Sequence, residues 1–314
     1  MAVKQISDLS IAVLVPCYNE GATIGTVVED FKAALPDATI YVYDNRSTDD
    51  TVERAQKAGA IVRSEERPGK GEVVRRMFGD IEADIYVMVD GDATYHAASA
   101  PALIDLMLKS HADLVNGARV DTAIKAYRPG HRFGNRLLTG LVSAFFGQMT
   151  TDMLSGYKMF SRRFVKSFPA HSRGFEIETE LMVHALELRM TIKEKSTPYV
   201  ERPEGSISKL NTVRDGIRIV SIIGLFVREE RPLAVFSLLG LILSGIALIL
   251  GIPVVVEFLH TGLVSRFPTA ILASALMITA VISVFSGLVL DTVTRGRREA
   301  KRFAYLAARD RRFE

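Results

Sequence analysis

The sequence contains one cysteine, no tryptophan and six histidines among its 314 residues. Cys17 alone cannot form an intrachain disulfide, and a cysteine-based metal site needs several thiolates. The histidines are scattered, and no two of them have the His-x-x-x-His spacing of a helical metal site. These absences exclude a disulfide framework and disfavour cysteine or histidine metal chemistry, so we expect the histidines to be structural.

An excess of positive charge is also absent from most of the chain. The net charge is +3, but residues 291–314 hold eight Lys or Arg against four Asp or Glu, a net +4, which leaves −1 for all that precedes them. A protein that follows a nucleic-acid backbone needs a basic surface. We therefore expect no nucleic-acid partner, although local arginine clusters could bind single phosphates.

Charged side chains are absent from two stretches, 233–256 and 267–290, of 24 residues each. A helix of about 20 residues crosses the ~30 Å hydrocarbon core of a bilayer, and a buried helix of a soluble protein rarely lacks charge on every face. The connector 257–266 holds one arginine while the tail 291–314 is basic, which places both chain ends in the cytoplasm. Residues 1–9 lack an apolar run of signal-peptide length. The sequence predicts an integral protein of the inner or plasma membrane, if bacterial, with a transmembrane hairpin.

Before this hairpin, short apolar runs alternate with segments of helical length. The runs are rich in β-branched or aromatic residues and cover 11–15, 40–43, 61–63, 85–89 and 114–116. Helices are predicted over 23–35 and 50–58, the second with Ser47, Thr48 and Asp49 as candidate caps. Such alternation predicts an α/β fold with a mostly parallel sheet covered on both faces, whose ligands bind beyond the carboxyl ends of the strands.

Polar loops follow the predicted strands at that edge. The first strand runs into Pro16-Cys17-Tyr18-Asn19-Glu20, and the second into an Asp-x-x-Ser-x-Asp-x-Thr segment that begins at Asp44. Neither loop is the Gly-x-Gly-x-x-Gly turn that a dinucleotide-binding domain needs. The fourth strand ends in Asp90-Gly91-Asp92, and two carboxylates at this spacing can converge on one hard divalent cation, Mg²⁺ or Mn²⁺.

The order of these motifs, with a Gly69-Lys70-Gly71 loop between them, resembles that of the family-2 glycosyltransferases of GT-A fold over about residues 11–160. With the hairpin added, the whole chain resembles the polyprenyl-phosphate branch, which includes dolichol-phosphate mannose synthases and bactoprenol glucosyltransferases. The resemblance implies a cytosolic GT-A catalytic domain over 1–200, an interfacial amphipathic segment over 201–232, the transmembrane hairpin over 233–290 and a basic cytosolic tail over 291–314. It also implies transfer of a monosaccharide from a UDP- or GDP-sugar to an undecaprenyl or dolichyl phosphate, with inversion.

The resemblance further assigns roles to residues that match the family's motifs. For the nucleotide-sugar these are Pro16, Tyr18 and Glu20, which frame the base and ribose, Asp44, which reads the base edge, Lys70, which contacts the base or a phosphate, and Asp90. The metal motif is Asp90 and Asp92, and Thr94 stands where mannose synthases have a metal-binding glutamine. Asp92 is thereby also implied in catalysis.

Acceptor residues are implied further along the chain. Arg119 follows the fifth strand, where the family's arginine approaches the diphosphate or the lipid phosphate, and Asp152 opens an Asp-x-x-Ser-Gly-Tyr-Lys segment beside the acceptor pocket. Both are catalytic candidates. The residues expected to bind the lipid phosphate are Arg132, Arg136, Arg202 and Lys209. Residues 211–228 mix arginines with large aliphatic side chains, and we expect them to form a helix in the headgroup layer.

A phosphate acceptor is already anionic at neutral pH, so the transfer needs no general base. We therefore expect Glu176, Glu178 and Glu180 to be surface carboxylates of a helix.

One alternative function is that of a processive polysaccharide synthase, but that branch carries a Gln-x-x-Arg-Trp segment and this chain has no tryptophan. A second is a membrane scaffold without turnover, against which the intact Asp-x-Asp pair argues. Small residues of the hairpin leave a homo-oligomer open, namely Gly240, Ser244, Gly245 and Gly251.

Overall fold

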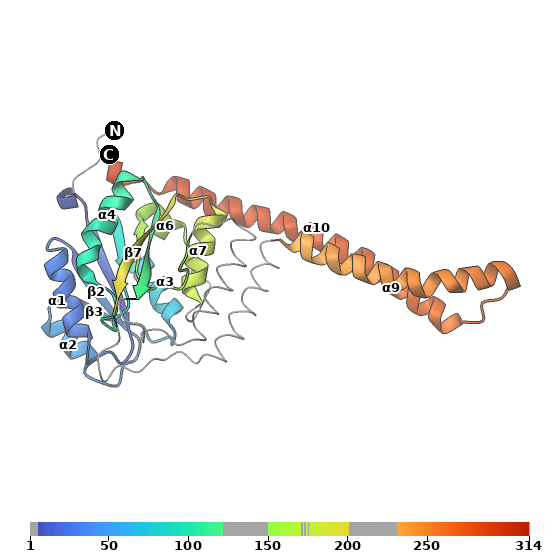
Figure 1. Cartoon of the computed structure of the whole chain (residues 1–314), viewed down its shortest axis with the longest axis horizontal. Helices are drawn as coiled ribbons and strands as arrows, with labels where there is room; N and C mark the ends of the chain where they lie inside the picture. The colour runs from blue at the N-terminus through green and yellow to red at the C-terminus, as the bar shows by residue number, and fades with distance from the viewer. Residues whose placement is uncertain are drawn as a thin grey trace. The chain divides into compact units, whose positions relative to one another are not determined.

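The computed structural model describes residues 6–121, 150–170, 172, 174, 176–200 and 231–313 (Figure 1). The chain divides into two compact units. The unit that the sequence predicts to be catalytic, hereafter the catalytic unit, comprises Met1–Val220 together with Ala300–Glu314, and the hairpin unit comprises Ser221–Glu299. The last fifteen residues therefore group with the N-terminal unit, from which the hairpin separates them in sequence.

The catalytic unit is built on a seven-stranded sheet with the order β3-β2-β1-β4-β6-β5-β7. Its strands are β1 (Ile11–Cys17), β2 (Thr39–Asp44), β3 (Ile61–Ser64), β4 (Ile85–Met88), β5 (Leu114–Asp121), β6 (Lys158–Ser161) and β7 (Ile192–Tyr199). Strand β6 alone runs antiparallel to both of its neighbours, and the other recorded pairings are parallel. The predicted mostly parallel sheet is confirmed, and each of the five predicted strands lies where its apolar run indicated.

Strands β1 and β4 are apolar along their whole length because helices cover both faces of the sheet. Alternate side chains of a strand point to opposite faces. Val13, Val87 and Val115 join the core that α1 (Ile24–Ala34) and α4 (Ala100–Lys109) complete. On the other face, Phe78 of α3 (Lys70–Asp80) contacts the rings of Tyr86 and Phe160. Burial on both faces fixes the register of these strands and thereby the positions of the loops that follow them.

The helices alternate with the strands along the chain, as the sequence predicted. Besides α1 and α4, the catalytic unit has η1 (Ile6–Asp8), α2 (Thr51–Lys57), α3 (Lys70–Asp80), η2 (Ala97–Ser99), α6 (Arg162–Ser167), α7 (Ile177–Glu187) and η3 (Arg311–Phe313). Helix α2 begins one residue after Asp50, which makes no side-chain cap bond. Of the three caps expected from the sequence, Asp49 accepts a hydrogen bond from the Thr51 amide at 3.1 Å. It therefore satisfies one of the unpaired amides at the helix start.

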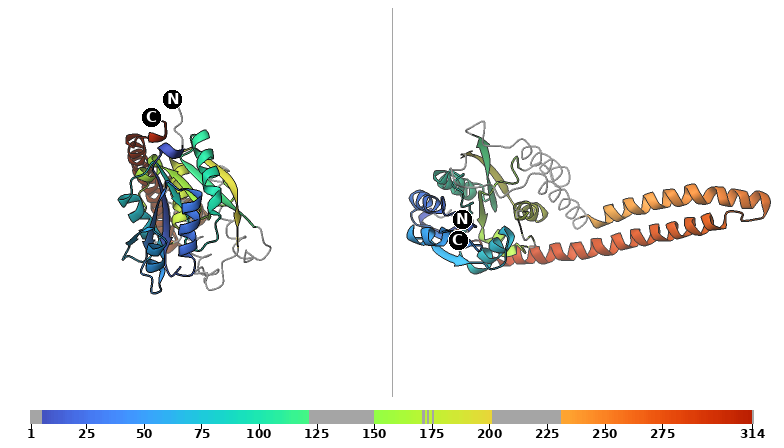
Figure 2. Two further views of the ribbon diagram at one scale, coloured as in Figure 1. Left: turned by 90° about the vertical axis from the view of Figure 1, so that its left-hand side faces the viewer. Right: turned by 90° about the horizontal axis from the view of Figure 1, so that it is seen from below.

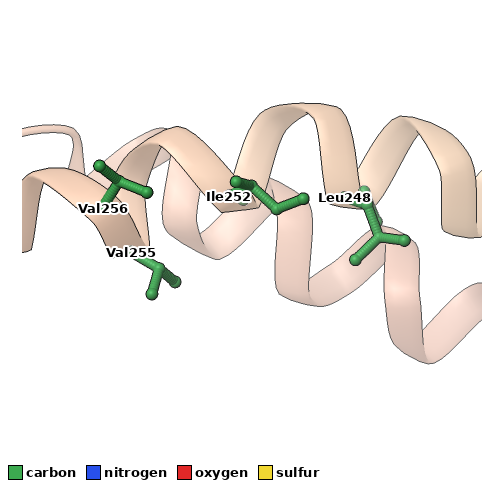
Figure 3. A pocket seen from close by; sticks show the side chains of 6 residues that line it. Leu248, Ile252, Val255 and Val256 are labelled. Carbon is green, nitrogen blue, oxygen red and sulfur yellow. The ribbon is translucent and has the colours of Figure 1, made fainter.

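The hairpin unit contains α9 (Pro232–Thr261) and the first part of α10 (Phe267–Ala307), which run side by side (Figure 2). Both helices are long and apolar enough to cross a bilayer, and only 11% and 22% of their most apolar windows are buried. A hollow on α9 is lined by Ala247, Leu248, Gly251, Ile252, Val255 and Val256 (Figure 3). Apolar side chains this exposed are not the packed core of a soluble domain.

Small residues let the two hairpin helices approach each other closely. A Cβ added to Gly240 would lie 2.8 Å from Val284 Cγ2 and 3.0 Å from the Ala280 carbonyl oxygen, and Ser283 donates to the Phe236 carbonyl at 2.9 Å. Gly240 therefore serves packing within the hairpin, as small residues do between membrane helices.

The chain's C-terminal segment (residues 300–313) packs on the catalytic unit at Asp113, the residue before β5. The Tyr305 hydroxyl donates to Asp113 Oδ2 at 2.9 Å, and the guanidinium of the fully buried Arg312 donates to the Ala112 carbonyl at 2.5 Å and to Asp310 at 2.7 Å. Arg163 of α6 pairs with Asp113 and Asp310, both at 3.1 Å. The sequence indicated only a basic tail after residue 290, whereas the structure shows helix α10 continuing to Ala307 and a buried arginine beyond it.

Candidate functional site

Strands β2, β1 and β4 are neighbours and parallel, so the loops that follow them meet at one edge of the sheet. Cys17 at the end of β1 lies opposite Asp44 at the end of β2, and the Asn45 amide donates to the Cys17 carbonyl at 2.8 Å. The Val89 amide donates to Leu14 O at 3.0 Å and extends the pairing of β4 to the start of the Asp-x-Asp segment. The edge predicted to bind ligands therefore gathers the three motifs.

The loops after β1 and β2 are bonded to each other. The Asn19 amide donates to Ser47 Oγ at 2.8 Å, and the Thr48 amide donates to Asn19 Oδ1 at 2.8 Å. The Glu20 amide donates to Thr51 Oγ1 at 2.9 Å. Asn19 has a φ of 51°, a left-handed conformation that asparagine tolerates better than most residues. These bonds fix the loop that presents Tyr18, whose side chain is exposed.

Asp44 and Asn45 brace the same edge from the end of β2. The buried Asp44 carboxylate accepts a hydrogen bond from the Ser47 amide at 3.1 Å. The Asn45 amide group donates to the carbonyls of Glu65 and Arg67, and its oxygen accepts from the Gly69 amide at 2.7 Å. Asn45 thus holds the Gly-Lys-Gly loop beside the first two motifs. No local sequence pattern indicates this role, because the bonds reach across to a loop twenty or more residues away.

The Asp-x-Asp segment is held from two sides. Thr23 Oγ1 donates to the Gly91 carbonyl at 2.7 Å, and a Cβ on Gly91 would lie 2.7 Å from the Cys17 sulfur. Asp92 is buried, and its Oδ1 accepts hydrogen bonds from the amide and the hydroxyl of Thr94, at 3.2 and 2.6 Å. In this geometry the Thr94 hydroxyl orients the Asp92 carboxylate.

Asp90 and Asp92 fit a divalent cation that is shared with a bound phosphate. The side chain of Asp90 is 31% exposed, and a Cβ on Gly156 would lie 2.2 Å from its Oδ2, so glycine leaves the space that this carboxylate occupies. Across the part of the chain that the structure describes, no cluster of three or more His, Cys, Asp or Glu side chains could hold a metal by itself. Magnesium-type ions commonly take one or two protein carboxylates and complete their shell with phosphate oxygens and water.

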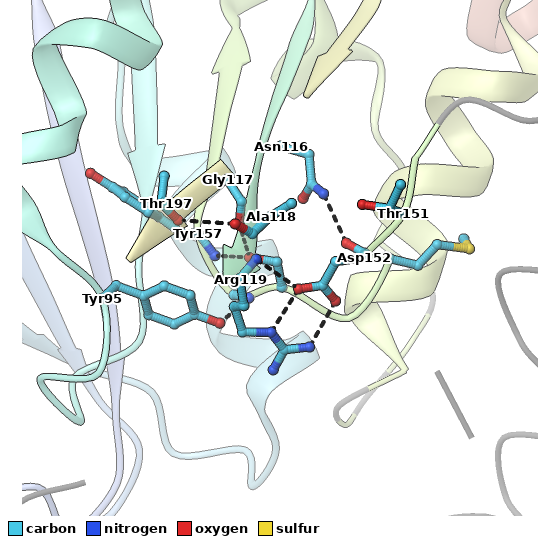
Figure 4. A network of polar contacts seen from close by, with 12 residues as sticks. Tyr95, Asn116, Gly117, Ala118, Arg119, Thr151, Asp152, Tyr157 and Thr197 are labelled. Atoms are coloured by element: carbon cyan, nitrogen blue, oxygen red, sulfur yellow. Dashed lines mark hydrogen bonds and ion pairs between the residues drawn. The ribbon is translucent and has the colours of Figure 1, made fainter. Parts of the chain in front are cut away.

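Arg119 at the end of β5 and Asp152 form a bidentate ion pair (Figure 4). The Nε to Oδ2 distance is 2.7 Å and the Nη2 to Oδ1 distance is 2.8 Å, and the Arg119 amide also donates to Oδ2. Burial by itself would raise the pKa of Asp152, but the hydrogen bonds and charge of Arg119 outweigh it and hold that pKa below its usual value. The guanidinium also lies 5.5 Å from the ring centre of Tyr199. The two catalytic candidates are thus brought together, with Asp152 ionised.

The expectation that Glu176, Glu178 and Glu180 are surface carboxylates is wrong for the last two, which lie in α7. Glu178 is 4% exposed and Glu180 is 6% exposed. Glu178 accepts hydrogen bonds from Lys70 at 2.6 Å and from Lys158 at 3.1 Å, and Lys70 also donates to Asp90. Because α7 is covered on most sides, its carboxylates lie inside the unit, and the buried lysines compensate the charge of Glu178.

His184 on the same helix is structural, as expected for the histidines. It is buried, its Nε2 lies 3.0 Å from Ser167 Oγ, and burial lowers its pKa to about 3.

The residues expected to bind the lipid phosphate lie outside the described residues, as does the amphipathic segment 211–228. They are Arg132, Arg136, Arg202 and Lys209.

Comparison with known proteins gives one family match, to glycosyl transferase family 2 over residues 12–168. The glycosyltransferase AglJ of Haloferax volcanii is 31% identical over 291 residues, which cover 92% of this chain and 95% of AglJ. A dolichyl-phosphate hexose transferase of the same organism is 27% identical and covers 70% of this chain and 95% of its own. The described motifs at the sheet edge fall within the matched region.

Among solved structures, a glucosyl-3-phosphoglycerate synthase from Mycobacterium tuberculosis superposes with a TM-score of 0.56 at 26% identity. The match covers 68% of this chain and 80% of the synthase, which was crystallised with Mn²⁺, UDP and glucosyl-3-phosphoglycerate. This chain therefore shares its fold with a protein that was crystallised with a nucleotide and a metal.

Proposed function

Because this chain belongs to glycosyl transferase family 2, we propose that it transfers one sugar from a nucleotide-sugar to a polyprenyl phosphate. The dolichyl-phosphate hexose transferase among its relatives supports a lipid-phosphate acceptor. The two apolar helices α9 and α10 support a site at a membrane surface. In this proposal the catalytic unit and both chain ends face the cytoplasm, as the basic tail predicts.

The observation that carries the proposal is the state of the carboxylates around the Asp-x-Asp segment. Asp152 is held by Arg119, which lowers its pKa, and Glu178 is held by two lysines. A carboxylate with a lowered pKa is a poor general base near neutral pH. An acceptor that arrives as a phosphate anion needs no deprotonation, so these paired carboxylates suit it better than they suit a hydroxyl acceptor.

The donor would lie along the edge where the three motifs meet. In this proposal the loops after β1 and β2 hold the base and ribose, and Asp90 and Asp92 hold Mg²⁺ or Mn²⁺ against the diphosphate. When bound, the ion supplies neutralising charge to the departing nucleotide. The Thr94 hydroxyl keeps Asp92 oriented, and Lys70 forms an ion pair with Asp90.

The acceptor would approach from the side of Arg119. Its guanidinium is oriented by Asp152, and a planar guanidinium recognises an anionic oxygen well. Attack of that oxygen on the anomeric carbon opposite the nucleotide inverts the configuration. The proposed ligands of the lipid phosphate remain Arg132, Arg136, Arg202 and Lys209.

Self-association through the hairpin also remains a proposal. Ser244 and Gly245 are the small residues to test, because Gly240 packs within the hairpin.

A donor panel tests this function. We expect the purified full-length protein with Mn²⁺ to release nucleotide from one member of a set of UDP- and GDP-sugars, and to do so at least tenfold faster with a short polyprenyl phosphate than without it. Release that depends on a glycan hydroxyl and not on the lipid phosphate would contradict the acceptor assignment. No release from any donor with either acceptor would contradict the donor class as well.

A further inference from the structure

Lys70 is buried between two carboxylates that come from opposite sides of the site. Its ammonium lies 2.5 Å from Asp90 Oδ1, in the segment after β4, and 2.6 Å from Glu178 Oε1 on α7. The ammonium of Lys70 is therefore shared between the two carboxylates, and Glu178 supplies one of the two ion pairs that hold it.

Glu178 also holds a second buried lysine. Its Oε2 accepts from Lys158, whose side chain is fully buried, at 3.1 Å. Lys158 donates as well to the carbonyls of Met153 and Ser155, in the loop that begins at Asp152. One carboxylate thus links the Gly-Lys-Gly loop, through Lys70, to the loop that carries Asp152, through Lys158.

We propose that Glu178 is a positioning residue for the transfer: it shares Lys70 with Asp90 and so leaves that aspartate able to bind the divalent cation. The inference rests on the proposed function, because it concerns the same metal site. The sequence alone predicts that Glu178 lies on the surface of a helix, so this role follows from the structure.

The argument follows from charge balance in a buried cluster. Lys70 and Lys158 bring two positive charges, and Asp90 and Glu178 bring two negative ones. Without the Glu178 carboxylate, both lysines remain and Asp90 is the ionised partner left to Lys70 within this cluster. Its Oδ1 is then held more tightly by the ammonium, and the excess positive charge opposes a cation at the same place.

The test replaces Glu178 by glutamine and measures metal binding before activity. Glu178→Gln keeps the size of the side chain and one acceptor oxygen but removes the charge. Titration with Mn²⁺ alone, with free Mn²⁺ followed by electron paramagnetic resonance, should give an affinity roughly 10- to 100-fold weaker than that of the wild type, the range typical of groups that orient metal ligands. In the transfer assay the Mn²⁺ concentration for half-maximal rate should rise by a similar factor, and saturating Mn²⁺ should restore most of kcat.

Asp84→Asn is the matched control. Asp84 is also a buried carboxylate, but it lies before β4, at the opposite end of the strand from Asp90, where it accepts from the amide and hydroxyl of Ser10 at 2.9 and 2.8 Å. Its neutralisation should lower the melting temperature while leaving the Mn²⁺ affinity within twofold of wild type. A loss of Mn²⁺ affinity in both variants would show a general effect of destabilisation and would overturn the proposal.

An unchanged Mn²⁺ affinity in a folded Glu178→Gln variant would also overturn it, while the transfer activity of the wild type would leave the proposed function standing. If the single variant does not fold, the double variant Lys158→Met with Glu178→Gln removes one charge of each sign, and its Mn²⁺ affinity is compared with that of the wild type instead. We expect its Mn²⁺ affinity to stay roughly tenfold below that of the wild type, and equality with the wild type would overturn the proposal.

Discussion

Replacement of Asp92 by asparagine is expected to reduce sugar transfer by about 10³-fold or more, equivalent to roughly 4 kcal/mol of transition-state stabilisation. Asp92 is buried beside Thr94 and is one of the two carboxylates proposed to hold the cation. An asparagine can still accept the hydrogen bonds of Thr94 through its amide oxygen, so the local structure should persist. The measurement is kcat with saturating donor and Mn²⁺.

The control for this prediction is again Asp84→Asn, which neutralises a buried carboxylate away from the motif edge. It should retain at least half of the wild-type rate. A rate for Asp92→Asn within tenfold of wild type would contradict the role of Asp92 in metal binding. A wild type that consumes no nucleotide-sugar, with no change in either variant, would instead favour the scaffold without turnover.

Replacement of Arg312 by methionine is expected to destabilise the catalytic unit by about 3–5 kcal/mol, the usual cost of removing one partner from a buried ion pair. Arg312 is fully buried, lies 2.7 Å from Asp310 and 3.6 Å from Asp113, and donates to the Ala112 carbonyl. Methionine fills a similar volume but leaves both carboxylates with one cation fewer. For a unit of this size the melting temperature should fall by about 10 °C, measured on the full-length protein in detergent.

The neighbouring Arg311 provides the control, because its side chain is exposed. Arg311→Met should shift the melting temperature by less than about 2 °C. Equal shifts in the two variants would mean that the C-terminal segment is not docked through Arg312. Below its melting temperature, Arg312→Met should transfer sugar at close to the wild-type rate, because Ala112 and Asp113 precede β5 and the motif loops follow the strands.

The strands were predictable because their signal is local. Each central strand is a short run of β-branched or aromatic side chains that must be buried on both faces, and the runs at 11–15 and 85–89 coincide with β1 and β4. The hairpin helices were predictable for the same reason, since a run of 24 residues without charge is recognisable from the local sequence alone. The end of the second helix was not predictable, because α10 continues past residue 290 to Ala307 with a charged sequence.

The remainder depends on contacts between residues far apart in the chain. Glu178 is 108 residues from Lys70, and a helical run with glutamates two apart gives no sign that a lysine will reach one of them. Tyr305 is 192 residues from Asp113, so the basic composition of the tail did not indicate that this segment packs on the catalytic unit. Buried charge of this kind is visible only once the partner that compensates it has been placed.

At the site, the sequence predicted which residues lie together more accurately than it predicted their individual roles. Lys70 and Asp90 lie close enough to form an ion pair, and so do Arg119 and Asp152, but the order of the motifs did not indicate which side chains would pair. Thr94 stands at a position where the resemblance predicts a metal ligand, and in the structure its hydroxyl donates a hydrogen bond to Asp92. Asn45 carried no chemical signal of its own, yet it bridges two loops.

The central claim, that the acceptor is a lipid phosphate, is tested most directly by the product itself. Purified protein would be incubated with Mn²⁺, a short polyprenyl phosphate and the labelled nucleotide-sugar that the donor panel selects, and the label would be partitioned between water and organic solvent. The account predicts label in the organic phase that mild acid releases as the free monosaccharide, and that disappears in Asp92→Asn. Label that stays in the aqueous phase, or that enters a polymer, would contradict it.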